Sequence, residues 1–228
     1  MLLYRTKLKI LGLRGKETMC AQKIWSDEEA VHDFLLHSNI GHLTTIDPQG
    51  WPHTVPMDYV WHDRAVFFHS GPGAKMDHLR QNPKVSFSVT ENLGLVTSDI
   101  TADNNPCQDV HLGRSVMVRG LAREISDPSE KTKILNILIA KYDPKAVRLG
   151  ENLPGSAAAA AHPGFAACRV VKIEVAEMSA RRLLLLDKPE MFRAALAEFF
   201  KNRGLIHGSA QDLKTYILLR SVTSDAGK

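Results

Sequence analysis

Residues 40–89 read IGHLTTIDPQGWPHTVPMDYVWHDRAVFFHSGPGAKMDHLRQNPKVSFSV, and apolar side chains alternate with polar ones through much of this stretch. Such alternation is typical of β-strands with one buried face, because successive side chains point to opposite sides. Pro48 and Gly50 occupy positions that a β-turn favours, so the two runs around them predict a β-hairpin. Four strands are expected here, over residues 40–46, 53–60, 65–70 and 85–89.

Pro56 lies inside the second of these strands. Proline cannot donate a hydrogen bond to a ladder, so it belongs at a sheet edge or at a bulge. Two explanations are open: the strand is an ordinary edge strand, or a ligand lies against this irregular backbone.

The connection HSGPGAK, residues 69–75, follows a predicted strand and precedes a short helical run that ends near Asn82 and Pro83. A helix N-terminus offers free N–H groups and a partial positive charge, glycines allow close approach of an anion, and Lys75 adds a full charge. Together these features predict a phosphate site. It is not a P-loop, whose spacing is absent. The alternative is a surface turn that carries an exposed lysine.

Two longer patterns occur in order: G-x-L-T-T-x-D-x-x-G-x-P-x-x-x-P-M-D-Y from Gly41, then F-F-H-S-x-x-x-x-K-x-x-x-L-R-x-N-P-x-V-x-F from Phe67. Arg114-Ser115-Val116, Arg119-Gly120-Leu121-Ala122 and Asp127-Pro128 follow. This succession resembles the pyridoxamine 5'-phosphate oxidase-like FMN-binding split barrels, and within them the nitroimidazole-resistance proteins. The resemblance covers about residues 23–182.

The resemblance implies a mainly β fold, a six-stranded antiparallel split barrel with flanking helices, and a homodimer with FMN at the subunit interface. The residues implied to border the flavin ring are His53, Thr54, Val55, Pro56, Met57 and Asp58. Those implied around the ribityl phosphate and the nearby ring edge are Phe68, His69, Ser70, Lys75 and Ser115.

The implied activity is that of a flavoprotein oxidoreductase in which reduced FMN reduces a small electrophile, as in a nitroimidazole reductase. His69 has two candidate roles: it passes a proton during reduction, or it only donates a hydrogen bond to the flavin. The rival hypothesis is a non-catalytic split-barrel protein that binds flavin or haem.

Composition excludes several other classes. Hydrophobic residues make up 44% and charged residues 24% of the 228-residue chain, as in ordinary globular proteins. The net charge of +4 lies entirely within residues 1–18, so the remainder is neutral and predicts no nucleic-acid partner. No apolar run approaches the roughly 18 residues of a membrane span. Three distant cysteines predict reduced thiols, a cytoplasmic location and no metal site.

The expected organisation is an N-terminal arm over residues 1–22, the FMN-binding domain over 23–182 and a helical extension over 183–228. Either Met19 is the natural start, or the residues before it form an arm on a partner subunit. Helices are expected from an N-cap at Ser26 and from an N-cap at Asp127. Further strands are expected over residues 115–125, interrupted at Gly120, and 168–176. Residues 90–114 are expected to form a long loop, with a candidate short strand over residues 93–100. The loop is a flap over the flavin, an arm onto the second subunit or a plain surface excursion.

Overall fold

The computed structural model describes residues 23–97, 106–145, 168–184 and residue 196. Within it the chain forms two compact units: one holds residues 26–89 and 116–180, and the other residues 1–25, 90–115 and 181–228. The expected N-terminal arm and almost all of the C-terminal extension lie outside the described residues. No helix in the described part is long and apolar enough to cross a membrane.

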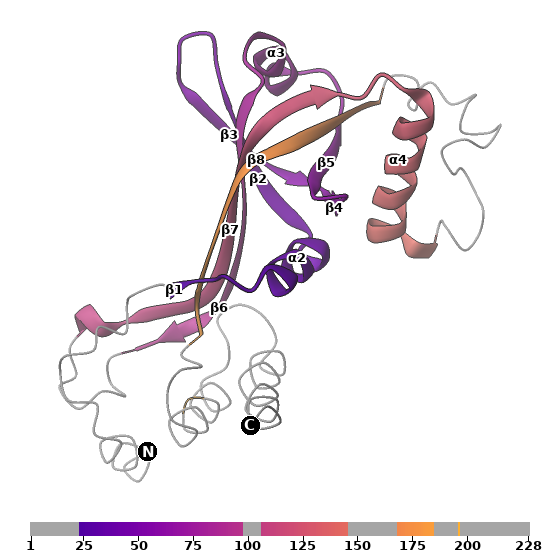
Figure 1. The fold of residues 1–228 in the computed structure, drawn as a ribbon. Helices are drawn as coiled ribbons and strands as arrows, with labels where there is room; N and C mark the ends of the chain where they lie inside the picture. The colour runs from indigo at the N-terminus through magenta and orange to yellow at the C-terminus, as the bar shows by residue number, and fades with distance from the viewer. Residues whose placement is uncertain (1–22, 98–105, 146–167, 185–195, 197–228) are drawn as a thin grey trace, which may run out of the picture. The chain divides into compact units, whose positions relative to one another are not determined.

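The strands are hydrogen-bonded into one sheet in the order β3-β2-β6-β7-β8-β5-β4, and β1 also pairs with β8 (Figure 1). Their bounds are β1 Lys23–Ile24, β2 Ile40–Ile46, β3 Pro52–Asp58, β4 Val60–His62, β5 Ala65–Ser70, β6 Lys84–Val96, β7 Val110–Glu124 and β8 Arg169–Leu183. The expected mainly β, antiparallel split-barrel class with flanking helices is confirmed, although the described residues form eight strands where six were expected.

The expected strand over residues 53–60 is in fact two strands, β3 and β4, separated at Tyr59. The Tyr59 N–H donates to the hydroxyl of Tyr142 over 2.9 Å, and that hydroxyl donates to the Tyr59 carbonyl over 2.7 Å. Because a side chain from α4 takes both backbone groups, Tyr59 interrupts the ladder.

The hairpin of β2 and β3 forms as expected, with Thr44 opposite Thr54. The Asp47 carboxylate accepts from the N–H groups of Gln49 and Trp51 over 2.9 and 2.7 Å. Gly50 has a positive φ of 88°, a conformation that glycine adopts at little cost. Local turn chemistry therefore sets this register.

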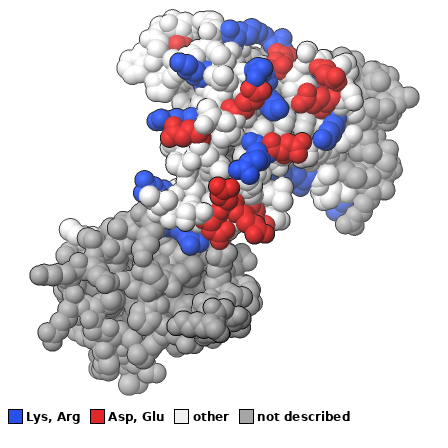
Figure 2. All heavy atoms as spheres, in the orientation of Figure 1, with Lys and Arg blue, Asp and Glu red and all other residues white. Residues whose placement is uncertain are grey.

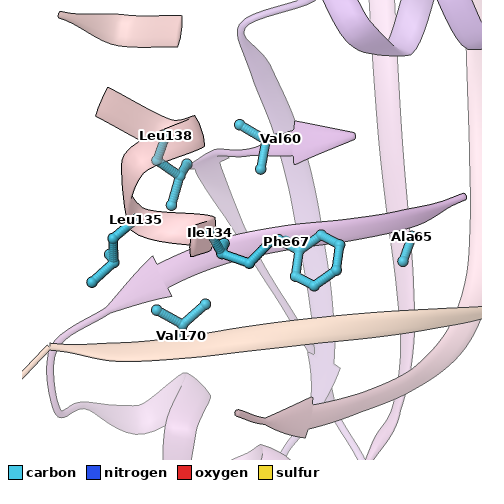
Figure 3. Close-up of a cluster of buried hydrophobic side chains, with 7 residues drawn as sticks. All are labelled: Val60, Ala65, Phe67, Ile134, Leu135, Leu138 and Val170. Carbon is cyan, nitrogen blue, oxygen red and sulfur yellow. The ribbon is translucent and has the colours of Figure 1, made fainter. Parts of the chain in front are cut away.

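The core between β4, β5, β8 and α4 is apolar (Figure 3). In Figure 3 one face of β5 carries Phe67 and Ala65 toward this cluster, whose other members are Val60, Ile134, Leu135, Leu138 and Val170. The neighbouring residues Val66 and Phe68 are also fully buried. Both faces of β5 are thus covered, as its nearly continuous apolar sequence indicates.

The helices are α2 Glu28–His37, α3 Ala74–Gln81 and α4 Pro128–Tyr142. The cap of α4 is Asp127, as expected, and its carboxylate accepts from the N–H groups of Ser129 and Glu130. The cap expected at Ser26 is wrong: Asp27 caps α2 by accepting from the Ala30 N–H over 3.0 Å. Either side chain suits an N-cap, and the helix begins one residue later than the sequence pattern indicates.

Three other boundaries differ from expectation. The prediction of a long loop over residues 90–114 is wrong, because β6 continues to Val96 and β7 begins at Val110. Of the candidate short strand over residues 93–100, residues 93–96 are the end of β6, and residues 98–100 lie outside the described residues. The interruption of β7 at Gly120 is also wrong, and the last strand runs to Leu183 rather than residue 176. At Gly120 a Cβ atom would meet the Glu174 carbonyl oxygen at 2.1 Å, so this glycine permits close approach to β8 without a break.

Charges of both signs are interspersed on the face shown in Figure 2, among the residues that the structure describes. Several are paired across strands, including Arg119 with Glu177 and Arg123 with Glu174. This mixture agrees with the neutral balance that the sequence assigns to the chain beyond its first 18 residues.

Candidate functional site

The glycine-rich connection joins β5 to α3. Its N-cap residue, Gly73, makes no side-chain cap hydrogen bond and has a φ of 149°. The Gly73 carbonyl accepts from the N–H groups of Met76 and Asp77 over 2.9 and 3.3 Å, which closes the first turn. The first turn of α3 therefore begins without a capping side chain over its amides, as an anion-binding helix terminus requires.

The space beside this turn is open. A Cβ atom built on Gly71 or on Gly73 would meet no atom within 4 Å outside its chain neighbours. Lys75 lies in the first turn and is half-buried. The carboxylate of Asp77 pairs with Arg80 on the same helix, so it is already engaged by another cation. The arrangement brings an uncapped helix end and a lysine to one open surface.

The β5 residues before the turn alternate in direction. Phe68 is fully buried, and Ser70 is buried with its hydroxyl donating to the Gly71 carbonyl over 2.7 Å. His69 lies between them, is exposed, and takes part in the ladder opposite Val170. Because strand side chains alternate, the structure places His69 on the face opposite to Phe68 and Ser70.

The strand that carries the predicted ring-binding residues is at an edge. β3 ends the hydrogen-bonded path and pairs with β2, so the structure supports the edge-strand explanation of Pro56. His53, Thr54, Pro56 and Asp58 are exposed, whereas Val55 and Met57 are half-buried. The strand thus presents mostly accessible side chains.

His78 ties α3 to this hairpin. Its Nδ1 lies 3.0 Å from the Thr45 hydroxyl on β2, and its ring meets the His53 ring edge-on at 5.3 Å. His78 is buried and Thr45 is fully buried. This contact brings the helix of the predicted phosphate site against the strand of the predicted ring site, within one unit of the chain.

Ser115 belongs to the other unit, the one that contains residues 90–115. It lies in β7 and is partly buried. Of the predicted candidates, the structure therefore brings those of β3, β5 and α3 together in one unit, and Ser115 is not among them.

A group near the end of β3 was missed by the sequence analysis. The Lys141 ammonium donates to the carbonyls of Ser38 and Tyr59 over 2.6 and 3.0 Å and lies 4.4 Å from the Tyr59 ring centre. The Tyr59 hydroxyl in turn donates to the Leu35 carbonyl over 2.7 Å. In the sequence Lys141 is an ordinary lysine in the last turn of a helix, so only its spacing from buried Leu138 hinted at this position.

Burial lowers the pKa of Lys141 to about 8, against the opposing effect of nearby Asp58. Burial also raises the pKa of Tyr142, and Asp58 adds to that increase, while the hydrogen bond with Tyr59 opposes it. A desolvated amine and a phenol thus lie close to Asp58, the last predicted ring-binding residue.

A sequence profile of the pyridoxamine 5'-phosphate oxidase family matches residues 27–182, more than half of the chain. The chain belongs to this family. The resemblance inferred from the motifs is thereby confirmed, and the matched range contains every predicted site residue. No protein with a curated functional description matches the chain.

Solved structures share the fold. A candidate 5-nitroimidazole antibiotic resistance protein from Bacteroides thetaiotaomicron is 22% identical with a TM-score of 0.56, over 71% of this chain and 87% of that one. The FAD and heme binding protein from Mycobacterium smegmatis is 17% identical with a TM-score of 0.58, over 70% and 73%. Flavocytochrome Anf3 from Azotobacter vinelandii is 22% identical with a TM-score of 0.55, over 70% and 68%. The structural similarity, at TM-scores of 0.55 to 0.58, shows a shared fold.

Proposed function

We propose that the chain binds FMN and acts as a flavin-dependent oxidoreductase on a small electrophile. The observation that carries the proposal is the uncapped N-terminus of α3 beside open glycines, with Lys75 in the first turn. A dianionic phosphate suits this donor set, because backbone N–H groups and a lysine supply hydrogen bonds and positive charge. Membership of the pyridoxamine 5'-phosphate oxidase family supports it.

The residues present fit a flavin as well as a bare phosphate. The phosphate would be held by the turn over residues 71–75. Exposed β3 supplies an adjoining surface for the ring through the residues between His53 and Asp58. Phe68 supports the turn from the core, where it is fully buried. A bound flavin would supply the electron-transfer chemistry, and the protein its position and surrounding charge.

His69 keeps both of its roles in this proposal. Its exposed ring can donate a hydrogen bond to the flavin or move a proton at the reacting atom of the substrate. Binding is the role we favour. The two roles differ experimentally: His69→Gln preserves a donor for binding but removes the proton transfer.

The neighbour described as an FAD and heme binding protein is the reason to retain the rival hypothesis, a cofactor-binding protein without turnover. Nothing in the described residues favours haem over flavin. His78 is engaged by Thr45 and His53, so the buried histidine of this region is not a free axial ligand.

The experiment is cofactor identification on the purified full chain. Flavin gives an absorbance band near ~450 nm and haem a Soret band near ~400 nm (general cofactor optics). The released pigment is compared by chromatography with FMN, FAD and riboflavin, and protein without pigment is titrated with FMN. We expect FMN to be released or bound. Failure to bind any flavin overturns the proposal, whereas release of FAD retains a flavin and rejects FMN.

Turnover is tested on the FMN-loaded protein. The protein is mixed anaerobically with reduced nicotinamide and a panel of nitroaromatic and quinone substrates. The nicotinamide should be oxidised continuously only when both the flavoprotein and a substrate are present. A stable flavin complex that none of these substrates reoxidises would favour the non-catalytic rival.

The proposal includes a homodimer with flavin sites at the subunit interface and a cytoplasmic location. Exposed apolar side chains on β7, Met117 and Leu121, are 48% and 42% exposed and supply a surface that a second copy would cover. The thiols of exposed Cys107 and half-buried Cys168 suit a reducing compartment.

A further inference from the structure

Trp25 follows β1 and is 3% exposed, in the unit that does not contain the glycine turn. Two guanidinium groups lie over its ring: Arg114 from β7 at 5.8 Å and Arg182 from β8 at 5.7 Å from the ring centre. Arginine stacks on aromatic rings because its planar cation is attracted to the negative ring face. One buried indole therefore gathers two cations from neighbouring strands.

The two cations are not equally compensated. The Nε of Arg114 donates to the Glu91 carboxylate over 2.5 Å, and both side chains are partly buried. The Nη1 of Arg182 is buried and has no hydrogen-bond partner. Among the described residues, Arg114 therefore has a carboxylate partner, whereas one terminal nitrogen of Arg182 has no acceptor.

A buried donor without a partner is costly, and more so when it is charged. The guanidinium edge offers parallel N–H groups whose geometry matches the oxygens of a carboxylate or phosphate. A ligand that accepts from Arg182 would remove this cost, and the low polarity around Trp25 would strengthen the contact.

We propose that Arg182, with Arg114 and Trp25, forms a binding site for a small oxyanion, a carboxylate or a phosphate. The site is independent of the proposed flavin phosphate site: its residues come from β7, β8 and the segment after β1, and it does not use Lys75. Trp25 orients the arginines, and Glu91 holds Arg114 in place. Arg182 supplies the N–H donor that has no hydrogen-bond partner among the described residues.

The test is tryptophan fluorescence of the full chain, titrated with inorganic phosphate and separately with acetate at constant ionic strength, with chloride as the comparison salt. We expect a saturable change with phosphate or acetate and none with chloride. The preferred anion distinguishes the two chemistries. Trp25→Phe should abolish the change, since Trp51 and Trp61 lie elsewhere in the chain.

The matched variants are Arg182→Met and Arg181→Met. Arg181 is exposed and adjacent on the same strand, so its loss should leave the response unchanged. Arg182→Met should weaken anion binding at least about tenfold, the size expected for a charge-assisted contact. Arg182→Lys keeps the charge and serves where the methionine variant does not fold; it should also weaken binding, because lysine lacks the fork.

Lys75→Ala separates this site from the flavin site and should retain the fluorescence response. The proposal is overturned by an equal response in the Arg182 variants and the wild type, by an equal response to chloride, or by no saturable response to either oxyanion. Loss of the response in Lys75→Ala would also overturn it, because the anion would then be reporting the glycine turn.

Discussion

A Cβ atom on Gly41 would lie 2.1 Å from Cζ of Phe87, a ring that is fully buried and meets Tyr59 at 5.0 Å. Gly41→Ala should therefore lower the free energy of unfolding by about 1–3 kcal/mol through overpacking. Urea unfolding measures this as a lower midpoint with an unchanged slope. The control is Gly71→Ala, where the added atom meets open space and the change should stay within about 0.5 kcal/mol. Equal losses in both variants would contradict the packing at Phe87.

Lys141 predicts a pH dependence of stability. Burial lowers its pKa from 10.5 in the unfolded chain to about 8 in the fold. Between these values the unfolded chain binds the proton that the folded chain has released, so the stability contributed by Lys141 rises with pH. The opposite trend arises from Tyr59 and Tyr142, whose pKa values are raised by burial from 10.0. Burial also raises the pKa of Cys168 from 9.0, which adds an opposite trend within pH 8 to 9.5, so the lysine is isolated by comparison with a variant that lacks it.

The variant that tests this dependence is Lys141→Met, compared with Lys145→Met at an exposed lysine of the same region. The difference in unfolding free energy between wild type and Lys141→Met should grow in favour of the wild type from pH 8 to 9.5. Lys145→Met should follow the wild type across the same range. A difference that stays constant or shrinks would mean that Lys141 keeps an ordinary affinity for protons in the fold.

At the scale of elements, the break between β3 and β4 depends on one hydroxyl from α4. Tyr142→Phe leaves the Tyr59 N–H without its 2.9 Å acceptor, which should cost about 1–3 kcal/mol. Amide hydrogen exchange at Tyr59 should accelerate much more than exchange in the β2–β3 hairpin, which has its own ladder. Unchanged protection of the Tyr59 amide would show that another group satisfies it.

The sequence predicts those elements whose signals are local. The Asp47 turn, the cap at Asp127 and the helix after Gly73 all depend on residues within a few positions of one another. The break at Tyr59 escapes prediction because its partner, Tyr142, lies 83 residues away. The extension of β6 past Val89 could not be predicted either, because the polar run from Thr90 resembles a loop. Its partner in the sheet is distant in sequence, since Glu91 pairs with Arg114.

The candidate site likewise has parts that follow from local sequence and parts that depend on contacts between distant residues. The turn and Lys75 follow from sequence, and so could the outward direction of His69, since alternation along β5 places it opposite Phe68 and Ser70. The contact of His78 with Thr45 and His53 could not be read from the chain, because three elements converge there. The binding roles of these residues stay predictions.

At the scale of the whole molecule, the proposed homodimer, with flavin sites at the subunit interface, makes cofactor affinity depend on protein concentration. Dilution below the dimer dissociation constant should weaken FMN binding, because monomers lack part of the site. Leu121→Glu, which places a charge among the exposed apolar residues of β7, should raise the concentration at which this occurs. Light scattering with parallel flavin titration measures both, and a monomer that holds FMN as tightly as the dimer would contradict the shared site.

In the proposed function, the glycine turn and Lys75 hold the phosphate of FMN. Lys75→Ala removes a charge-assisted contact of roughly 1.5–3 kcal/mol, which corresponds to roughly 10- to 150-fold weaker FMN binding. Riboflavin lacks the phosphate, so its affinity should hardly change. Lys84→Ala, at an exposed lysine just beyond α3, is the matched control and should bind both ligands as the wild type does.

The measurement is a flavin fluorescence titration of the wild type and both variants with FMN and with riboflavin. We predict a loss for Lys75→Ala that is confined to FMN. An equal loss for both ligands would mean that Lys75 shapes the loop instead of binding the phosphate, and no loss for either would make residues 71–75 an ordinary surface turn.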